Sequence, residues 1–321
     1  MSFDAVLIVG FGGPEKAEDV MPFLENVTRG RRIPRERLLE VAGHYYHLGG
    51  KSPINEHLRE LKAALERELV LRGPALPVYW GNRNWHPMLP DVVRQMKEDG
   101  VRRAVAFIAA PWSSYSSCRQ YLENIEAARA AAGEGAPEIV RTRVFYDHPG
   151  FLEPVGDRLR AALEELPLDL RGDAEILFTA HSIPMSMADT SRYAVQLQEA
   201  CAAVARAAGR AKWRLVYQSR SGPPAQAWLE PDICDALGEV RSKGVVVVPI
   251  GFLSDHVEVI WDLDHEARAR AEELGLVMVR AGTVGTDARF AGMIRELILE
   301  RMEGRAGEMC GLDCCPAPAR G

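Results

Sequence analysis

The sequence lacks a hydrophobic run long enough to cross a membrane. Its apolar stretches, of which residues 245–250 are typical, are much shorter than the ~18 residues that a spanning helix needs. The first residues, MSFDAVLIVGFGG, have no positively charged stretch ahead of their short apolar run, so we expect a β-strand there and no secretion signal. These absences predict a cytoplasmic globular protein without a transmembrane segment, and they leave peripheral contact with a membrane open.

A surplus of positive charge is also missing. The 321 residues include 39 Lys and Arg against 45 Asp and Glu, which gives a net charge of -6. Because a nucleic-acid-binding protein needs a basic face to neutralise phosphates, we expect no nucleic-acid partner. Hydrophobic residues make up 47% of the chain, which is typical of a globular protein with a substantial core.

Cysteine is scarce and unevenly placed. Three of the six cysteines, Cys310, Cys314 and Cys315, lie within six residues near the C-terminus. A disulfide framework is a poor explanation of this cluster in a chain without a secretion signal. Clustered thiolates favour zinc or an iron-sulfur cluster, and either needs a fourth ligand, for which Cys118 is the best candidate. The cysteines at positions 201 and 234 are expected to be structural.

The chain shows a regular alternation of apolar strands and helical patterns. The predicted strands are 4–11, 77–80, 104–109, 139–145, 176–180, 215–218, 245–250 and 277–280. Strands that alternate with helices predict right-handed βαβ units and mainly parallel sheets. The alternation divides near residue 148 and ends after residue 304, so we predict an α/β protein with domains at 1–148 and 149–304 and a cysteine-containing tail at 305–321.

The stretch GVVVVPIGFLSDHVEVIWDLDHE, residues 244–266, combines a buried strand with many ionisable side chains. Ser254 and Asp255 are good N-cap residues, so we expect a helix to begin there. Glu258, Asp262 and Glu266 recur every four residues, which aligns three carboxylates along one side of that helix. The end of a strand in an open α/β sheet is a usual place for chemistry, although a solvated acidic face has the same spacing.

The spacing of these carboxylates also predicts an irregular helix. Positions four residues apart drift by about 40° per step in a regular α-helix, so the three groups would spiral away from a common line. A π-bulge removes much of that drift and is typical of functional sites. We therefore predict a π-bulge in this helix. Because neighbouring carboxylates repel one another, at least one of them should have a pKa raised toward neutrality.

Two other predicted strand ends carry polar side chains. His181 follows the strand at 176–180, and parallel strands present their carboxyl ends at one crevice, so His181 and Glu258 can face one another. A histidine opposite a carboxylate suits proton transfer or binding of a divalent metal, whereas a structural histidine is the alternative. The segment QSRSGPP at 218–224 either orients a ligand or closes its loop. A serine hydrolase is disfavoured because the G-x-S-x-G motif is absent.

Taken together, the motifs resemble the ferrochelatase family over nearly the whole chain and in family order. They are LIVGFGGP, FLENVTRGR, HYYHLGGKSPIN, SSYSSCRQY, TAHSIP, YQSRSGPPAQAWLEPD and GFLSDHVEVIWDLDHE. The family inserts ferrous iron into a porphyrin in haem biosynthesis, and the resemblance implies two Rossmann-like domains with the porphyrin in the cleft between them. NVTRGR and QSRSGPP are most similar to the actinobacterial type, which acts on coproporphyrin III. Protoporphyrin IX is the alternative substrate.

The resemblance also implies roles for individual residues. His181 and Glu258 match the family's active-site residues, and Asp262 and Glu266 match acidic positions on a path for Fe²⁺ or protons. The implied substrate-binding residues are Phe11, Arg29, Arg31, Tyr45, Ser52 and Ser114. Since Phe11 stands where some members have a tyrosine near the iron, an axial tyrosine ligand is not expected. Some members carry a [2Fe-2S] cluster, for which the matching cysteines are Cys118, Cys310, Cys314 and Cys315.

Several interpretations stay open at this point. Arginine can bind porphyrin propionates bidentately, but the basic segment TRGRRIPRER, residues 28–37, also fits ordinary solvated charge. A cobalt chelatase of related fold would use the same histidine and carboxylates, and a tetrapyrrole or iron carrier would bind without turnover. The oligomeric state is not predicted.

Overall fold

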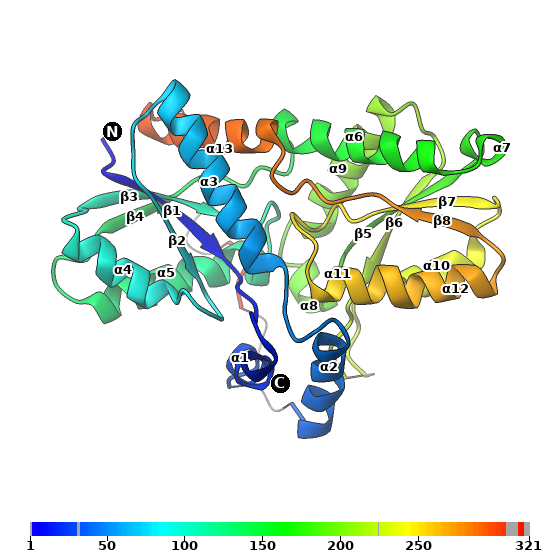
Figure 1. The fold of residues 1–321 in the computed structure, drawn as a ribbon, viewed down its shortest axis with the longest axis horizontal. Helices are drawn as coiled ribbons and strands as arrows, with labels where there is room; N and C mark the ends of the chain where they lie inside the picture. Colours follow the sequence, from blue (N-terminus) through cyan, green and yellow to red (C-terminus); the bar gives the residue numbers. More distant parts are fainter. Residues whose placement is uncertain (1, 31–32, 224, 306–313, 318–321) are drawn as a thin grey trace. The chain divides into compact units, whose positions relative to one another are not determined.

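A computed structural model describes residues 2–30, 33–223, 225–305 and 314–317. This part of the chain forms two compact units. The first contains described residues from 2–109, 120–143 and 291–305, and the second contains those from 110–119, 144–290 and 314–317. Each unit has a four-stranded parallel sheet with helices on its faces, so the protein is an α/β protein with two Rossmann-like domains (Figure 1).

The sheet of the first unit has the strand order β2-β1-β3-β4. Its strands are β1 Ala5–Gly10, β2 Val78–Asn82, β3 Arg103–Ile108 and β4 Glu138–Arg141. All six residues of the inner strand β1 are buried, which explains why this segment is apolar without alternation.

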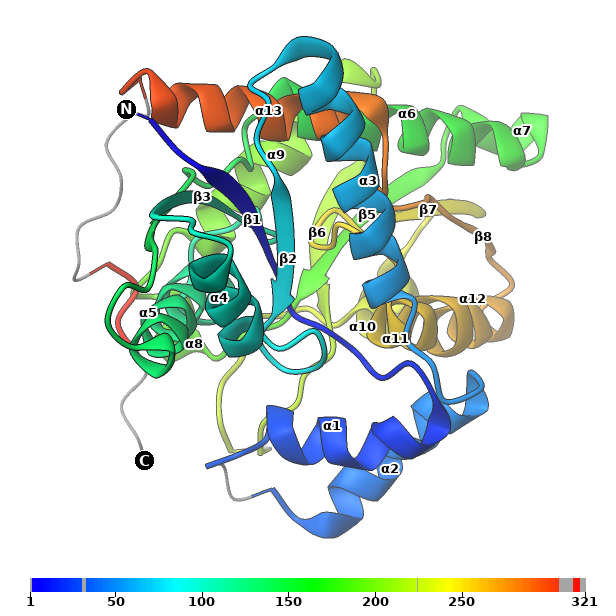
Figure 2. The ribbon, with the colours of Figure 1, turned by 60° about the vertical axis from the view of Figure 1, so that its left-hand side comes forward.

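Helices surround the first sheet. They are η1 Ala17–Asp19, α1 Val20–Val27, α2 Arg35–His47, α3 Ile54–Arg72, α4 Leu89–Glu98, α5 Gln120–Ala132 and most of α13 Ala288–Met302. In Figure 1, α3 lies on one side of the sheet, and α4 and α5 lie on the other. Figure 2 shows α1 and α2 packed together beyond the carboxyl end of β1.

The sheet of the second unit has the order β6-β5-β7-β8, which repeats the topology of the first. Its strands are β5 Glu175–His181, β6 Trp213–Gln218, β7 Gly244–Val248 and β8 Val277–Arg280. The outer strands β6 and β8 flank the inner pair. His181 and Gln218 pair at the carboxyl ends of β5 and β6, so these two positions open the same edge of the sheet.

Helices cover both faces of the second sheet. They are η2 Tyr115–Arg119, α6 Pro149–Glu165, α7 Leu168–Arg171, α8 Met185–Ala188, α9 Tyr193–Ala207, α10 Ile233–Glu239, α11 Val257–Val259, η3 Ile260–Ala267 and α12 Arg268–Glu273. Figure 1 shows α6 and α9 on one face and α10, α11 and α12 on the other. None of the helices in the described segments is both long and apolar enough to cross a membrane.

All eight predicted strands are confirmed, although some ends differ. The strand predicted at 139–145 stops at Arg141, and the one predicted at 245–250 stops at Val248. The earlier end of the strand predicted at 245–250 has a local cause. The Ile250 N–H donates a hydrogen bond back to the Val248 carbonyl (2.8 Å), and this turns the chain.

A close approach at Gly251 brings this turn against the end of β5. The Gly251 N–H donates to the Thr179 carbonyl at 2.9 Å, and a Cβ at position 251 would lie 2.5 Å from the Cα of Ala180. Any residue other than glycine would therefore push the two segments apart. The chain that follows β7 is thus held close to the end of β5, which carries His181.

Candidate active site

The helix that follows β7 is π-helical in its middle. It starts as α11, continues as the π-helix η3 from Ile260 to Ala267, and ends as α12. The predicted π-bulge is confirmed. Glu258 lies in α11, whereas Asp262 and Glu266 lie within η3, so the irregular segment falls on the carboxylates whose spacing predicted it.

The predicted start of this helix is wrong. The first helical residue is Val257, and the N-cap position is taken by His256 in an extended conformation, not by Ser254 or Asp255. The carboxylate of Asp255 instead forms an ion pair with Arg280 at 3.1 Å. Binding to a charged guanidinium replaces the helix-capping role that the residue type suggests.

Asp262 is the most strongly perturbed acid on this helix. Its Oδ2 accepts hydrogen bonds from the Ser219 hydroxyl and from the Gln218 side-chain amide, the latter at 3.2 Å. Burial raises the pKa of Asp262 to about 7, repulsion from Glu258 and Glu266 adds to the increase, and the two hydrogen bonds oppose it. The expectation of a carboxylate with a pKa near neutrality is confirmed. Asp262 can therefore hold or release a proton at physiological pH.

Ser219, one of the two residues that bind Asp262, has an unusual backbone conformation. Ser219 adopts φ 61°, in the left-handed region that disfavours residues other than glycine. It follows Gln218 directly at the end of β6. The sequence left open whether the segment 218–224 orients a ligand or closes a loop. In the structure, its first two residues bind a carboxylate of the π-helix.

His181 and Glu258 face each other in the second unit. The His181 Nε2 lies 4.0 Å from a carboxylate oxygen of Glu258, and the two side chains are 33% and 48% exposed. The His181 Nδ1 forms a hydrogen bond with the Ser182 carbonyl. A carbonyl only accepts, so Nδ1 carries hydrogen and the neutral ring has its lone pair on Nε2, toward Glu258. The Tyr193 hydroxyl donates to the His181 carbonyl at 2.9 Å and fixes the backbone there.

Glu266, like Glu258 at the other end of the carboxylate series, is exposed. Its Oε1 accepts a hydrogen bond from the Trp261 indole N–H at 2.9 Å, and the Trp261 ring stacks on His265 with centroids 5.1 Å apart. Together the three carboxylates form an acidic strip with a half-buried member, Asp262, in the middle. Within the described segments, no group of three His, Cys, Asp or Glu side chains is placed to hold a metal ion, so the strip is not a preformed cage.

The substrate-binding candidates of the first unit lie near an aromatic cluster. Phe11 is 36% exposed, its ring packs edge-on against Phe23 at 6.4 Å, and the Arg83 guanidinium lies 5.7 Å from its centroid. Tyr45 and Ser52 are buried, at 8% and 2% exposure. Of these three side chains, Phe11 is the one that presents a surface to solvent.

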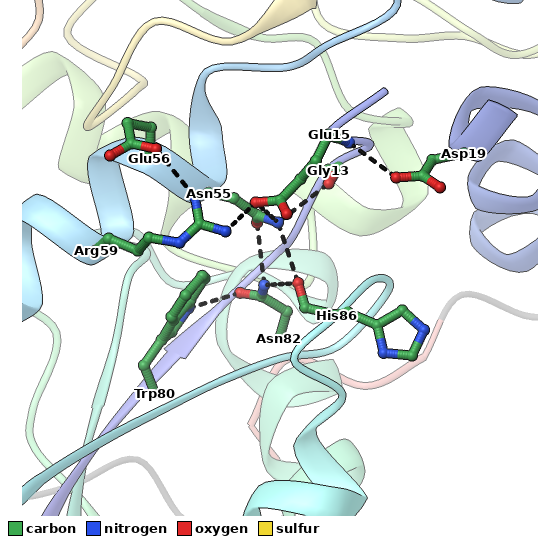
Figure 3. A network of polar contacts seen from close by, with 9 residues as sticks. All are labelled: Gly13, Glu15, Asp19, Asn55, Glu56, Arg59, Trp80, Asn82 and His86. Carbon is green, nitrogen blue, oxygen red and sulfur yellow. Dashed lines mark hydrogen bonds and ion pairs between the residues drawn. The ribbon is translucent and has the colours of Figure 1, made fainter. Parts of the chain in front are cut away.

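A buried polar network fixes the loop between Phe11 and α1 (Figure 3). The Asn55 amide donates to the Gly13 carbonyl at 3.2 Å and to the His86 carbonyl at 3.0 Å, and the Asn82 amide donates to Asn55 at 3.1 Å. Both asparagines are fully buried. Since buried amides are costly without partners, the network holds this loop in one conformation.

The remaining sequence candidates lie in several places. Arg29 is exposed two residues after the end of α1, while Arg31 and Cys310 lie outside the described residues. Ser114 is fully buried, and its hydroxyl accepts a hydrogen bond from the Ser117 N–H at 3.0 Å. The substrate-binding roles of Arg29, Arg31 and Ser114 stay predictions.

Three of the four cysteines matched to a cluster are described. Cys118, in η2, is 1% exposed, Cys315 is 6% exposed, and both belong to the second unit with Cys314. Thiol donors shielded from solvent suit an iron-sulfur cluster in their chemistry, but the described residues include no group of three Cys, His, Asp or Glu side chains placed to bind a metal, so the cluster stays a prediction.

Arg280 and Asp264 were missed by the sequence analysis. Arg280 ends β8, and Asp264 lies between two of the aligned carboxylates in η3. A lone arginine at the carboxyl end of an apolar strand was the available signal. It did not identify a partner, because the partner is distant in the chain.

The fold is the first indication of the class of protein. DR2241 from Deinococcus radiodurans, described as structurally similar to chelatases, shares the fold with a TM-score of 0.57 at 16% identity, over 96% of this chain and 56% of that chain. This similarity shows a chelatase-like fold alone.

Sequence comparisons define the family. The ferrochelatase model matches residues 3–302. The coproporphyrin III ferrochelatase of Nocardia farcinica is 51% identical, over 98% of this chain and 92% of its own length. The ferrochelatase of Rhodopirellula baltica is 49% identical, over 98% and 93%. The chain belongs to the ferrochelatase family, and the predicted activity, insertion of ferrous iron into a porphyrin in haem synthesis, is confirmed over the cobalt chelatase and carrier alternatives.

The raised pKa of Asp262 predicts a pH-dependent effect of Asp262→Asn on stability. Because the folded-state pKa, about 7, exceeds the ordinary value of 3.8, the folded state binds this proton more tightly than the unfolded state. The group therefore costs the folded state increasing free energy as pH rises from about 4 to 7. The asparagine variant, which cannot ionise, should gain relative stability over that range, approaching about 4 kcal/mol above pH 7. Urea unfolding of both proteins at pH 4.5 and 8 measures this, and an equal difference at both values would contradict it.

Proposed function

We propose that this ferrochelatase acts on coproporphyrin III and that His181 and Glu258 are its catalytic residues. The observation that carries the proposal is the pair itself. The His181 Nε2 lies 4.0 Å from a carboxylate oxygen of Glu258, and Asp262, with a pKa of about 7, lies on the same helix as that carboxylate.

The reaction requires both a base and an iron ligand. A porphyrin carries two N–H protons in its plane, so two protons leave for each Fe²⁺ that enters, and the ring must distort before the metal can reach its nitrogens. A site that binds the distorted ring more tightly than the flat one lowers this barrier. The Nε2 of His181 can accept a ring proton, and the resulting imidazolium is stabilised by the negative charge of Glu258.

The acidic strip supplies the ligands for iron. Carboxylate oxygens are suitable transient ligands for a divalent cation on its way to the ring, provided that they do not form a tight cage that retains it. Asp262, because it titrates near neutrality, can also take up a proton that leaves the ring. In this proposal, His181 removes protons, and Glu258, Asp262 and Glu266 deliver iron and accept protons for release to solvent.

The catalytic roles predict that Glu258→Gln abolishes turnover while porphyrin binding persists. Loss of the negative charge removes both the iron ligand and the partner of the imidazolium, so kcat should fall by about 100-fold or more. Asp262→Asn should have a milder effect, because Asp262 lies four residues further along the helix than Glu258, which faces His181. Anaerobic metallation assays measure kcat, and porphyrin fluorescence titration measures Kd. Near-normal turnover in Glu258→Gln would overturn the proposed roles.

The choice of coproporphyrin III rests on the similarity to the coproporphyrin III ferrochelatase of Nocardia farcinica and on the charge of the substrate. Coproporphyrin III carries four propionates against two in protoporphyrin IX, and Arg29 offers an exposed guanidinium that can bind a propionate. In a competition assay, coproporphyrin III should be metallated preferentially, and Arg29→Ala should raise KM for it. Arg37→Ala is the matched control, because Arg37 pairs with Glu40 at 2.6 Å. Equal use of both porphyrins would contradict the preference for coproporphyrin III. An unchanged KM in Arg29→Ala would contradict the role of Arg29.

We further propose that Cys118, Cys310, Cys314 and Cys315 hold a [2Fe-2S] cluster, supported by the burial of Cys118 and Cys315 within one unit. Such a group supplies a one-electron redox centre when bound. A cytoplasmic location fits thiols that are kept available for metal.

The cluster predicts a coloured protein. Cys314→Ser should abolish the visible absorbance of the purified enzyme, whereas Cys201→Ala, which alters a core cysteine of α9, should retain it. Absorbance spectra with iron and sulfide analysis test this. Stoichiometric zinc without iron or sulfide in the native protein would exclude the cluster.

A further inference from the structure

One arginine holds two aspartates from different parts of the active-site helix region. Arg280, at the end of β8, has a side chain only 15% exposed and forms ion pairs with Asp255, in the loop before the helix, and with Asp264, in η3. We propose that Arg280 is a positioning residue that keeps η3 in the π-helical register in which Glu258, Asp262 and Glu266 serve iron insertion.

The contacts fix orientation as well as distance. The Arg280 Nε and Nη2 donate to the two oxygens of Asp264 at 2.8 and 2.9 Å, which is a bidentate pair. Its Nη1 and Nη2 donate to the two oxygens of Asp255 at 3.1 and 3.4 Å. A planar guanidinium that binds both carboxylates by two bonds each restricts their rotation, which a lysine ammonium would not do.

Because of the position of Asp264, its contact with Arg280 opposes rotation of the helix about its axis. Asp264 follows Asp262 by two residues, a rotation of about 200° in a regular helix, so the two side chains leave opposite sides of the helix. Asp262 is bound by Gln218 and Ser219 at the end of β6, and Asp264 is bound by Arg280 at the end of β8. Since β6 and β8 are the two outer strands of the sheet, the helix is fastened toward both edges.

The contact with Asp255 adds a constraint along the chain. Asp255 lies nine positions before Asp264, and the same guanidinium binds both. If η3 relaxed to a regular α-helix, the residues after Ile260 would turn and shift relative to the loop, and Arg280 could no longer hold both carboxylates. The double contact therefore stabilises the rarer helical form.

Burial makes the contact strong enough for this role. Desolvation lowers the pKa of Arg280, but its hydrogen bonds and charge interactions with Asp264 and Asp255 outweigh it, so the net pKa is above the ordinary value. The guanidinium is therefore charged throughout the working range. Removing it would leave Asp255 and Asp264 near each other, with Arg268 at the longer distance of 3.9 Å from Asp264.

Arg280→Lys and Arg280→Gln test the proposal in the full-length enzyme. Both variants should raise KM for Fe²⁺ by about tenfold or more and lower kcat, while the Kd for porphyrin changes less than about twofold. The lysine variant keeps the charge but loses the bidentate geometry, so it separates positioning from charge balance. Hydrogen exchange in the peptide spanning 257–267 should accelerate in both. All assays are made well below the Tm of each variant.

Arg214→Gln is the matched control. Arg214, in β6 of the same sheet, also bridges two carboxylates, Glu175 and Glu239, each at 2.7 Å, but lies toward the opposite end of the strands. This variant should lose stability without a change in KM for Fe²⁺ or in exchange at 257–267. A wild-type KM for Fe²⁺ in Arg280→Lys, or kinetics of Arg280→Gln equal to those of Arg214→Gln, would overturn the positioning role.

The inference rests on the proposed roles of the carboxylates, and the two can fail separately. Wild-type turnover in Glu258→Gln would remove the catalytic proposal whatever the Arg280 variants do. An inactive Glu258→Gln together with wild-type kinetics in both Arg280 variants would remove the positioning role alone.

Discussion

The half-buried carboxylate of Asp262 is the constraint on which the candidate site depends. Burying a carboxylate is costly unless it is hydrogen-bonded or protonated, and this one is both supplied with donors and shifted to a pKa of about 7. The donor Ser219 adopts a left-handed backbone conformation to reach it. Strain of this kind persists only where the surrounding structure imposes it, and it is typical of functional sites.

The π-helix links this carboxylate to the rest of the second unit. One side of the helix reaches the end of β6 through Asp262, and the other reaches the end of β8 through Asp264. Between these strands, β5 presents His181 and β7 leads into the helix by way of Gly251. All four strands of the sheet thus contribute to the placement of a few side chains, which is the usual consequence of a parallel sheet with its carboxyl ends at one edge.

The first unit holds its loop after β1 with a network of amides and charged side chains. The buried amides of Asn55 and Asn82 hold this loop, Glu15 of the loop accepts hydrogen bonds from Asn55 and Arg59, and Phe11 is left partly exposed at the start of the loop. A loop held in one conformation, with an exposed aromatic ring at its start, suits contact with a flat apolar ring. The second unit, by contrast, concentrates groups that bind protons and cations.

The sequence by itself determined the eight strands, the parallel sheets and the π-bulge. Strands buried on both faces must be apolar, and carboxylates four residues apart can line up only if the helix departs from regular geometry. The tertiary structure alone decided that Asp255 binds Arg280 instead of capping the helix, that Ser219 binds Asp262, and that Asn55 meets Asn82. These contacts join residues far apart in the chain, and they depend on strand order and register, which residue types and local spacing do not encode.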